Sequence, residues 1–562
     1  MASASRQWSP PAIAVKLACA AGVLGYFLYF AFDGTRVKWA ADDPMNLYTY
    51  WRLGIWKVLW SNLAFFDGSY RPMGGLFYLP IYFFAHLNPL PCRIVLVCLL
   101  GFNAFLVYRF ARLLGASERV SGLAALATCV HGSMADLIYQ TSALYDILCF
   151  TFFFLAFNAY LRIRGPGRAL RIRDAALVLA LYIAAMNSKE MAVTFPALLC
   201  LYELLYHPPQ QWRRPVLFRW VVSACWPGMV AGGLTAAFLY GKSHGPDPLT
   251  ATESYRPVLS FVRWMNANVN YTGAMFRAAG EFNWATAPIL WLVLFYLAWR
   301  RKRPHLQFAW LFILIGTLPI SFIPQRAGSC LYLPLVGWAL FAATVASDLI
   351  ELLAREPWLA RLPRWACECV WTILPVALFF QWTAANLKDA PRIFREIQAP
   401  TWRVISDMNR LNLHPPHGSR IVILNSAPFP GFDVFFMTSL WWNDKTLEIH
   451  TEPDPAKADV PSFDYVLRFE NGRLAIVKAP PRESGTPGSA RESSGPSPPV
   501  AKRPRRWPGG RAGRGALKPS ARYAIATSWF AATATRAAHP RGVGTRACRA
   551  ETHLGAGAGS AG

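Results

Sequence analysis

The stretch Asp42-Asp43-Pro44-Met45-Asn46 follows the first long apolar run, Ile13 to Phe32, and most of the sequence after it is apolar as far as residue 387. That first run is roughly 20 residues long, which is enough to cross the hydrocarbon core of a bilayer. The two adjacent acids therefore fall where a membrane-water interface is expected. Carboxylates at such a place are either solvated loop residues or part of a functional site.

The composition indicates a multi-pass membrane protein. Of the 562 residues, 54% are hydrophobic and only 16% are charged, which is too apolar for an average soluble protein. The net charge of +26 comes from Lys and Arg in short loops and in the C-terminal tail, as the positive-inside rule predicts, so the expected partner is the lipid bilayer and not nucleic acid. The eleven Cys show no metal-ligand spacing and are interpreted as small core residues.

The expected fold is an α-helical polytopic membrane domain over residues 12–387, preceded by a polar segment, 1–11. The apolar runs predict roughly ten to thirteen transmembrane helices, and several short runs suggest half-helices around a cavity. The first run is interpreted as a retained anchor, with a cleaved signal peptide as the alternative. A first extracytoplasmic loop, 33–73, contains a Trp-rich piece, Leu47 to Phe66, that is expected to lie on the membrane surface.

Basic loops predict the orientation of the chain. The Arg-rich segments 162–173, 213–219 and 300–303 should be cytoplasmic. The acidic pair, the segment Asn187 to Glu190, the Gln325-Arg326 turn and everything after Leu387 then share the opposite face. This holds only if one apolar piece between Leu47 and Leu87 is interfacial or re-entrant.

A small extracytoplasmic α/β domain is predicted over residues 388–480. It should contain a helix from Trp402 to Leu413, a strand from Arg420 to Asn425 and a hairpin that turns at Asn471-Gly472. Residues 481–562 form a basic tail rich in Pro, Gly, Ala and Arg that is expected to be disordered.

Four polar islands interrupt the apolar sequence, and charged groups at membrane depth are costly enough to suggest function. They are the acidic pair with Tyr70-Arg71-Pro72; His131, Asp136 and Asp146; Asn187-Ser188-Lys189-Glu190; and Gln325-Arg326 leading into Leu331-Tyr332-Leu333-Pro334.

In this order and spacing, the islands resemble the GT-C glycosyltransferases, and most closely the tetratricopeptide-containing transmembrane O-mannosyltransferases and their bacterial relatives. The resemblance covers roughly residues 12–350. It implies an inverting transferase that takes a sugar from a polyprenyl-phosphate donor, and a multi-pass protein of a bacterial inner (plasma) membrane. The acceptor is a hydroxyl of a protein or a glycan on the non-cytoplasmic face.

Such a transfer needs a base for the acceptor hydroxyl and cations for the leaving phosphate. The candidate base is Asp43, with Asp42 as the alternate. The candidate substrate-binding residues are Arg71, Lys189, Glu190, Arg326, His131, Asp136 and Asp146. No cofactor is certain, although the acids leave a divalent metal open.

Two other functions stay open. A transporter or flippase of a lipid-linked sugar shares broken helices and buried charges. A non-catalytic scaffold of the same fold is the other, because Leu144 departs from the family pattern and no repeat array follows; Gly328-Ser329 is a further departure from that pattern.

Overall fold

The computed structural model describes residues 10–479 except for positions 41, 69, 166–167, 169, 246–247, 249–252, 279, 357–362, 425–430 and 453–459. Most of the predicted N-terminal polar segment and the whole predicted basic tail lie outside the described residues.

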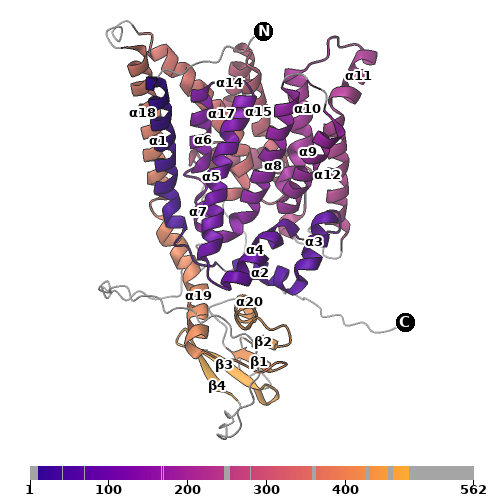
Figure 1. The fold of residues 1–562 in the computed structure, drawn as a ribbon, viewed down its shortest axis with the longest axis vertical. Coiled ribbons are helices and arrows are strands. Elements are labelled where there is room, and N and C mark those ends of the chain that lie inside the picture. Colours follow the sequence, from indigo (N-terminus) through magenta and orange to yellow (C-terminus); the bar gives the residue numbers. More distant parts are fainter. Residues whose placement is uncertain are drawn as a thin grey trace, which may run out of the picture. The chain divides into compact units, whose positions relative to one another are not determined.

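Helices dominate the described chain up to residue 387, and Figure 1 shows α5, α6, α8, α9, α10 and α17 running alongside one another. Proline stands in the first turn of several of them, where the missing amide hydrogen is not needed. The long helices are α1 (Pro10–Gly34), α4 (Pro72–Ala85), α5 (Leu90–Leu113), α6 (Glu118–Cys129), α8 (Leu144–Arg164), α9 (Ile172–Ser188), α10 (Phe195–Tyr206), α11 (Arg214–Ala224), α12 (Trp226–His244), α13 (Phe261–Phe276), α14 (Thr286–Arg300), α15 (Pro304–Gly316), α17 (Tyr332–Leu353) and α18 (Arg364–Leu387). Short segments between them are α7 (Ala135–Tyr139), η1 (Thr141–Ala143), η2 (Glu190–Thr194), η4 (Glu253–Tyr255), α16 (Leu318–Ser321) and η5 (Gly328–Leu331).

Helix α8 is the centre of this bundle. In the most apolar stretch of the segment that contains α8, 83% of the residues are buried, whereas the corresponding value for α5 is 44%. Its aromatic side chains pack on those of neighbouring helices, and the rings of Phe150 and Tyr332 stack with centroids 4.0 Å apart. The residue that opens α8, Leu144, is completely buried in the same core.

The expectation of roughly ten to thirteen transmembrane helices is wrong. Among the described residues, five helices are long and apolar enough to span a membrane, or six if the bent pair α11 and α12 forms one span. The other apolar runs fold as shorter helices, such as α6 and α10 with 12 residues each and α9 with 17. Breaks at polar residues shorten these runs below the roughly 20 residues that a bilayer core requires.

The Trp-rich piece of the first loop forms α2 (Asp42–Leu53) and α3 (Ile55–Leu63). Gly54 joins them with φ 79°, a left-handed conformation that glycine adopts without strain. Trp56 and Trp60 on α3 are 81% and 58% exposed, as expected for aromatic residues that contact lipid headgroups. The membrane-surface position of this piece stays a prediction.

The C-terminal domain, α19 to β4, consists of α19 (Ala390–Leu411), β1 (Arg420–Leu424), α20 (Gly431–Trp442), β2 (Glu448–Glu452), η8 (Val460–Ser462), β3 (Tyr465–Glu470) and β4 (Arg473–Lys478). Its sheet has the order β2-β1-β3-β4, visible below α20 in Figure 1. Strand β1 runs parallel to β2 and β3, and β4 returns antiparallel. The predicted hairpin is present, with Asn471 and Gly472 at positive φ in its turn. Strand β2 was not predicted, because alternating polar residues and no apolar run mark it in the sequence.

Candidate functional site

The acidic pair begins helix α2, and its two carboxylates have opposite surroundings. Asp42 is exposed, whereas Asp43 is completely buried. Asp43 Oδ2 accepts a 2.8 Å hydrogen bond from the amide of Ala40, and Oδ1 is buried without a hydrogen-bond partner among the described residues. Desolvation raises the pKa of Asp43 to about 7, against the opposing effects of the Ala40 amide and the Arg93 guanidinium. Desolvation also raises the pKa of Asp42, but Asp42 is exposed and is therefore the acid that can be reached from outside the protein.

Arg93 lies behind Asp43 and was missed by the sequence analysis. It is completely buried on α5, and its guanidinium donates hydrogen bonds to the carbonyls of Gly34 and Ile138. A lone charge three residues into the apolar run of α5 was the signal that could have found it. Its contacts hold the end of α1, the end of α7 and the acidic segment together.

Arg71 precedes α4 and has φ 41°, a left-handed conformation that is uncommon for a residue with a side chain. Its Nη2 donates to Glu190 Oε2 at 3.0 Å, and its guanidinium lies over the ring of Tyr70, 4.7 Å from the centroid. Although burial opposes ionisation, the charges of Arg71 and Lys242 lower the pKa of Glu190 to about 2. This ion pair joins two of the predicted polar islands.

A second buried ion pair lies next to the first in the sequence. Helix α9 ends at Ser188 because Lys189 has extended backbone angles, and this break points Lys189 into the bundle. Lys189 Nζ lies 2.6 Å from both carboxylate oxygens of Asp146, in the first turn of α8, and 3.4 Å from Cys330 Sγ in η5. This pair joins the second, third and fourth islands.

Asp136 extends this network on the other side of η5. Its Oδ2 accepts a 2.6 Å hydrogen bond from the amide of Ser329. Gly328 has φ +62°, and a Cβ atom there would lie 2.5 Å from the same oxygen. The Gly328-Ser329 departure from the family pattern therefore provides the close approach that this hydrogen bond requires.

His131 and Arg326 have different surroundings. The His131 ring packs against Trp382 of α18 at 5.0 Å between centroids. Burial lowers the pKa of His131 to about 3, so its imidazole is neutral. Arg326 lies over the ring of Tyr255 at 4.7 Å. The two ion pairs, Arg71–Glu190 and Lys189–Asp146, are formed by other residues.

Tyrosines connect the two ion pairs with the acidic helix, and the sequence analysis assigned them no role. Tyr50 of α2 donates a 2.8 Å hydrogen bond to the Arg71 carbonyl, and its hydroxyl lies 2.9 Å from that of Tyr145. Tyr78 stacks on Tyr50 at 6.1 Å between centroids. The backbone of Arg71 is thus fixed to the helix that carries the acids.

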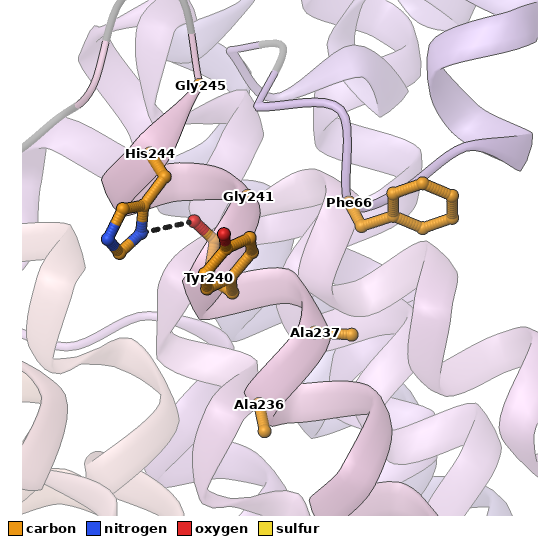
Figure 2. A pocket seen from close by; sticks show the side chains of 7 residues that line it. All are labelled: Phe66, Ala236, Ala237, Tyr240, Gly241, His244 and Gly245. Atoms are coloured by element: carbon orange, nitrogen blue, oxygen red, sulfur yellow. Dashed lines mark hydrogen bonds between the residues drawn. The ribbon is translucent and has the colours of Figure 1, made fainter.

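An open cavity of about 570 Å³ lies between the first loop and α12. Figure 2 shows Phe66 on one side and α12 on the other, and the lining residues are Phe66, Ala236, Ala237, Tyr240, Gly241, His244 and Gly245. The backbone of the first loop packs directly against the backbone of α12. The lack of a Cβ atom at Gly241 permits this contact, because a Cβ atom there would overlap the carbonyl of Phe66. Lys242, the next residue of α12, is buried and interacts electrostatically with Glu190 and Arg71.

The acidic residues in the sequence allow a divalent metal ion as a possible cofactor. Among the residues that the structure describes, no group of three or more His, Cys, Asp or Glu side chains is arranged to hold a metal ion.

The chain has a distant structural similarity to a known protein. No family model matches the chain, and a search of curated proteins finds no match. Among solved structures, the chain is similar to the oligosaccharyltransferase of Archaeoglobus fulgidus, solved with a tethered acceptor peptide that contains the NVT sequon. The identity is 12% and the TM-score 0.39, over 78% of this chain and 64% of that one, so the chain spans less than two thirds of that protein's length. At this level the likeness assigns neither donor nor acceptor.

Proposed function

We propose that this protein is a membrane glycosyltransferase that moves a sugar from a polyprenyl-phosphate donor to a hydroxyl of a protein or glycan on the non-cytoplasmic face. The observation that carries the proposal is the joined network of buried charges next to the acidic helix. Arg71 pairs with Glu190, Lys189 pairs with Asp146, and Tyr50 bonds the Arg71 backbone to α2. Buried charges are costly, and such networks mark functional sites.

Transfer requires the acceptor oxygen to attack the anomeric carbon while the bond from that carbon to the phosphate oxygen breaks. The acceptor proton passes to a carboxylate, and the phosphate leaves with the bonding electron pair. Asp42 is our preferred base because it is exposed, and Asp43, which is buried against Ala40, orients the start of the helix. Asp43 remains the alternative base, because its Oδ1 has no hydrogen-bond partner among the described residues.

Arg71 is our preferred ligand for the leaving phosphate. Its Nη2 is used by Glu190, but its Nε is buried without an acceptor in the described chain. A guanidinium can keep one ion pair and bind a phosphate oxygen with a second donor. Lys242 is buried near Glu190 and Arg71, and its neighbour Gly241 lines the apolar cavity, which suits an isoprenoid chain attached to that phosphate.

The test is a transfer assay with the purified full-length protein in lipid and a panel of labelled polyprenyl-phosphate sugars. Wild type should consume a donor and label a hydroxyl acceptor. Asp42→Asn and Arg71→Met should each lower the rate about 100-fold or more. Asp33→Asn, which removes a half-buried acid ahead of the pair, is the matched control and should retain the wild-type rate.

Other outcomes would refute the proposal in distinct ways. Movement of intact donor across a sealed vesicle without consumption would identify a transporter. Donor binding with no turnover for any member of the panel would identify a scaffold. Full activity in Asp42→Asn, with none in Asp43→Asn, would return the base role to Asp43.

A further inference from the structure

The C-terminal domain contacts the last turn of the acid-bearing helix α2 and the segment that precedes this helix. In the last turn of α2, Lys445 Nζ lies 3.4 Å from the carbonyl of Arg52 and 5.3 Å from the centre of the Trp51 ring. Ahead of α2, the side-chain oxygen of Gln398 on α19 accepts a 3.0 Å hydrogen bond from the amide of Lys38. Gln398 is 2% exposed and also donates to the carbonyl of Tyr139 at 2.8 Å.

Asn443 is the central residue of this contact. Its Oδ1 accepts a 2.7 Å hydrogen bond from Trp51 Nε1 on α2 and lies 3.3 Å from the Tyr82 hydroxyl on α4. Tyr82 also donates to the carbonyl of Leu440, the last turn of α20. Asn443 adopts φ 52° at the end of that helix, a conformation that asparagine tolerates better than most residues.

Helices α2 and α4 are the two that matter for the proposed reaction. Asp42 lies at the start of α2, and Arg71 lies immediately before the start of α4. Gly54 follows α2 with positive φ, so the helix is joined to α3 by a residue that permits rotation. The separation between base and phosphate ligand therefore depends on what fixes α2 against α4, and Asn443 bonds to both.

We propose that the C-terminal domain acts as a clamp on α2, and that Asn443 is a positioning residue that sets Asp42 relative to Arg71. This inference rests on the proposed function for its effect on catalysis, but the clamp itself is a statement about structure. Small displacements of reacting groups, on the order of 1 Å, cost about 100-fold in rate. Loss of the Asn443 bonds should therefore lower kcat while the folded protein persists.

The experiment compares three variants of the full-length protein in lipid. Asn443→Ala removes both hydrogen bonds. Asn443→Asp keeps an acceptor oxygen and tolerates the same backbone conformation. Asn412→Ala is the matched control, because Asn412 also ends a helix of the same domain with positive φ, 45°, and among the described residues its side chain bonds to His414 and not to α2 or α4.

We expect Asn443→Ala to lower kcat about 10- to 100-fold, with Asn443→Asp restoring most of it and Asn412→Ala unchanged. Equal losses in Asn443→Ala and Asn412→Ala would mean a general effect on the domain, and unchanged kcat in Asn443→Ala would mean no positioning role. Either result overturns the inference.

A second measurement does not depend on activity. Cysteines are introduced at Arg52 and Lys445, and the yield of cross-linking by a short bifunctional thiol reagent is measured against each variant that has only one of the two introduced cysteines, so that the free native cysteines are controlled for. The yield should fall in the Asn443→Ala background and persist in the Asn412→Ala background; equal yields overturn the clamp. Because cross-linking reports on the clamp even if wild type transfers no sugar, failure of the proposed function and failure of the clamp remain distinguishable.

Discussion

Breaking the Lys189–Asp146 pair should cost more stability than removing both charges together. Each carboxylate oxygen of Asp146 lies 2.6 Å from Lys189 Nζ, and the two side chains are 6% and 11% exposed. In Lys189→Met the carboxylate loses the cation that compensates its burial, and in Asp146→Asn the ammonium loses its anion. In the double variant neither charge remains to be desolvated.

The expected magnitude follows from this burial. Each single substitution should lower the free energy of unfolding by about 3–5 kcal/mol, which is two to three and a half powers of ten in the folding equilibrium. The double variant should lose less than about 2 kcal/mol, since replacing a whole buried pair by apolar or neutral groups is often close to neutral. The coupling energy between the two sites should therefore be several kcal/mol.

Equilibrium unfolding in mixed micelles, followed by circular dichroism, measures these values in a double-mutant cycle. Glu396→Gln is the control, because Glu396 pairs with Arg392 at 3.7 Å while their side chains are 67% and 66% exposed; it should change stability by less than about 0.5 kcal/mol. Additive losses in the double variant would refute the reasoning, because the two charges would then not be compensating each other.

Three further predictions concern other parts of the chain. Burial raises the pKa of Asp43 from 3.8 to about 7, so its contribution to stability is complete below about pH 4 and is lost as the pH rises to 7; Asp43→Asn should flatten that slope in unfolding measured across this range. Glu203, completely buried, accepts hydrogen bonds from Arg164 Nε at 2.9 Å and Nη2 at 2.6 Å. Glu203→Gln should cost about 3 kcal/mol in the same unfolding assay and leave transfer per folded molecule unchanged, because this pair is at the opposite end of α8 from the candidate site. Gly241→Ala should push the first loop off α12, since its new Cβ atom overlaps the carbonyl of Phe66, and should weaken donor binding in a titration with a fluorescent polyprenyl phosphate.

The sequence predicted the membrane class, the hairpin and the polar islands because each depends on local pattern. Apolar periodicity, the Asn471-Gly472 turn and isolated charges can all be recognised within about 20 residues. The number of spans could not be predicted in the same way. The helices that end at Ser188 and Cys129 end there because the polar residues that follow have tertiary partners. Those partners cannot be recognised from the apolar sequence of the helices themselves.

Local sequence pattern does not predict which of the two adjacent acids, Asp42 or Asp43, is accessible. Successive residues of a helix point about 100° apart, so one of two adjacent acids at the start of α2 must face inward, but the sequence does not say which one. The choice is made by Arg93, by the Ala40 amide and by the contact of α2 with the C-terminal domain, and all of these require the folded structure. Asp43 was the preferred candidate base from the sequence, and it is the buried member of the pair in the structure.

Lys189, Arg326 and Arg71 were the three cations predicted from the sequence as phosphate ligands, and they have different surroundings in the structure. Lys189 directs its ammonium group at both oxygens of Asp146 and at Cys330, so a phosphate would have to displace a carboxylate from it. Arg326 lies over the ring of Tyr255, with its guanidinium carbon 4.7 Å from the ring centroid. Arg71 alone among them combines a bond to Glu190 with a second, buried donor that has no acceptor among the described residues. Because an unsatisfied buried donor costs about 1–3 kcal/mol, a ligand oxygen that accepts from Arg71 Nε recovers that free energy on binding. Under the proposed function, we therefore expect Arg71 to bind the phosphate and Lys189 to hold α8 and η5 in place around it.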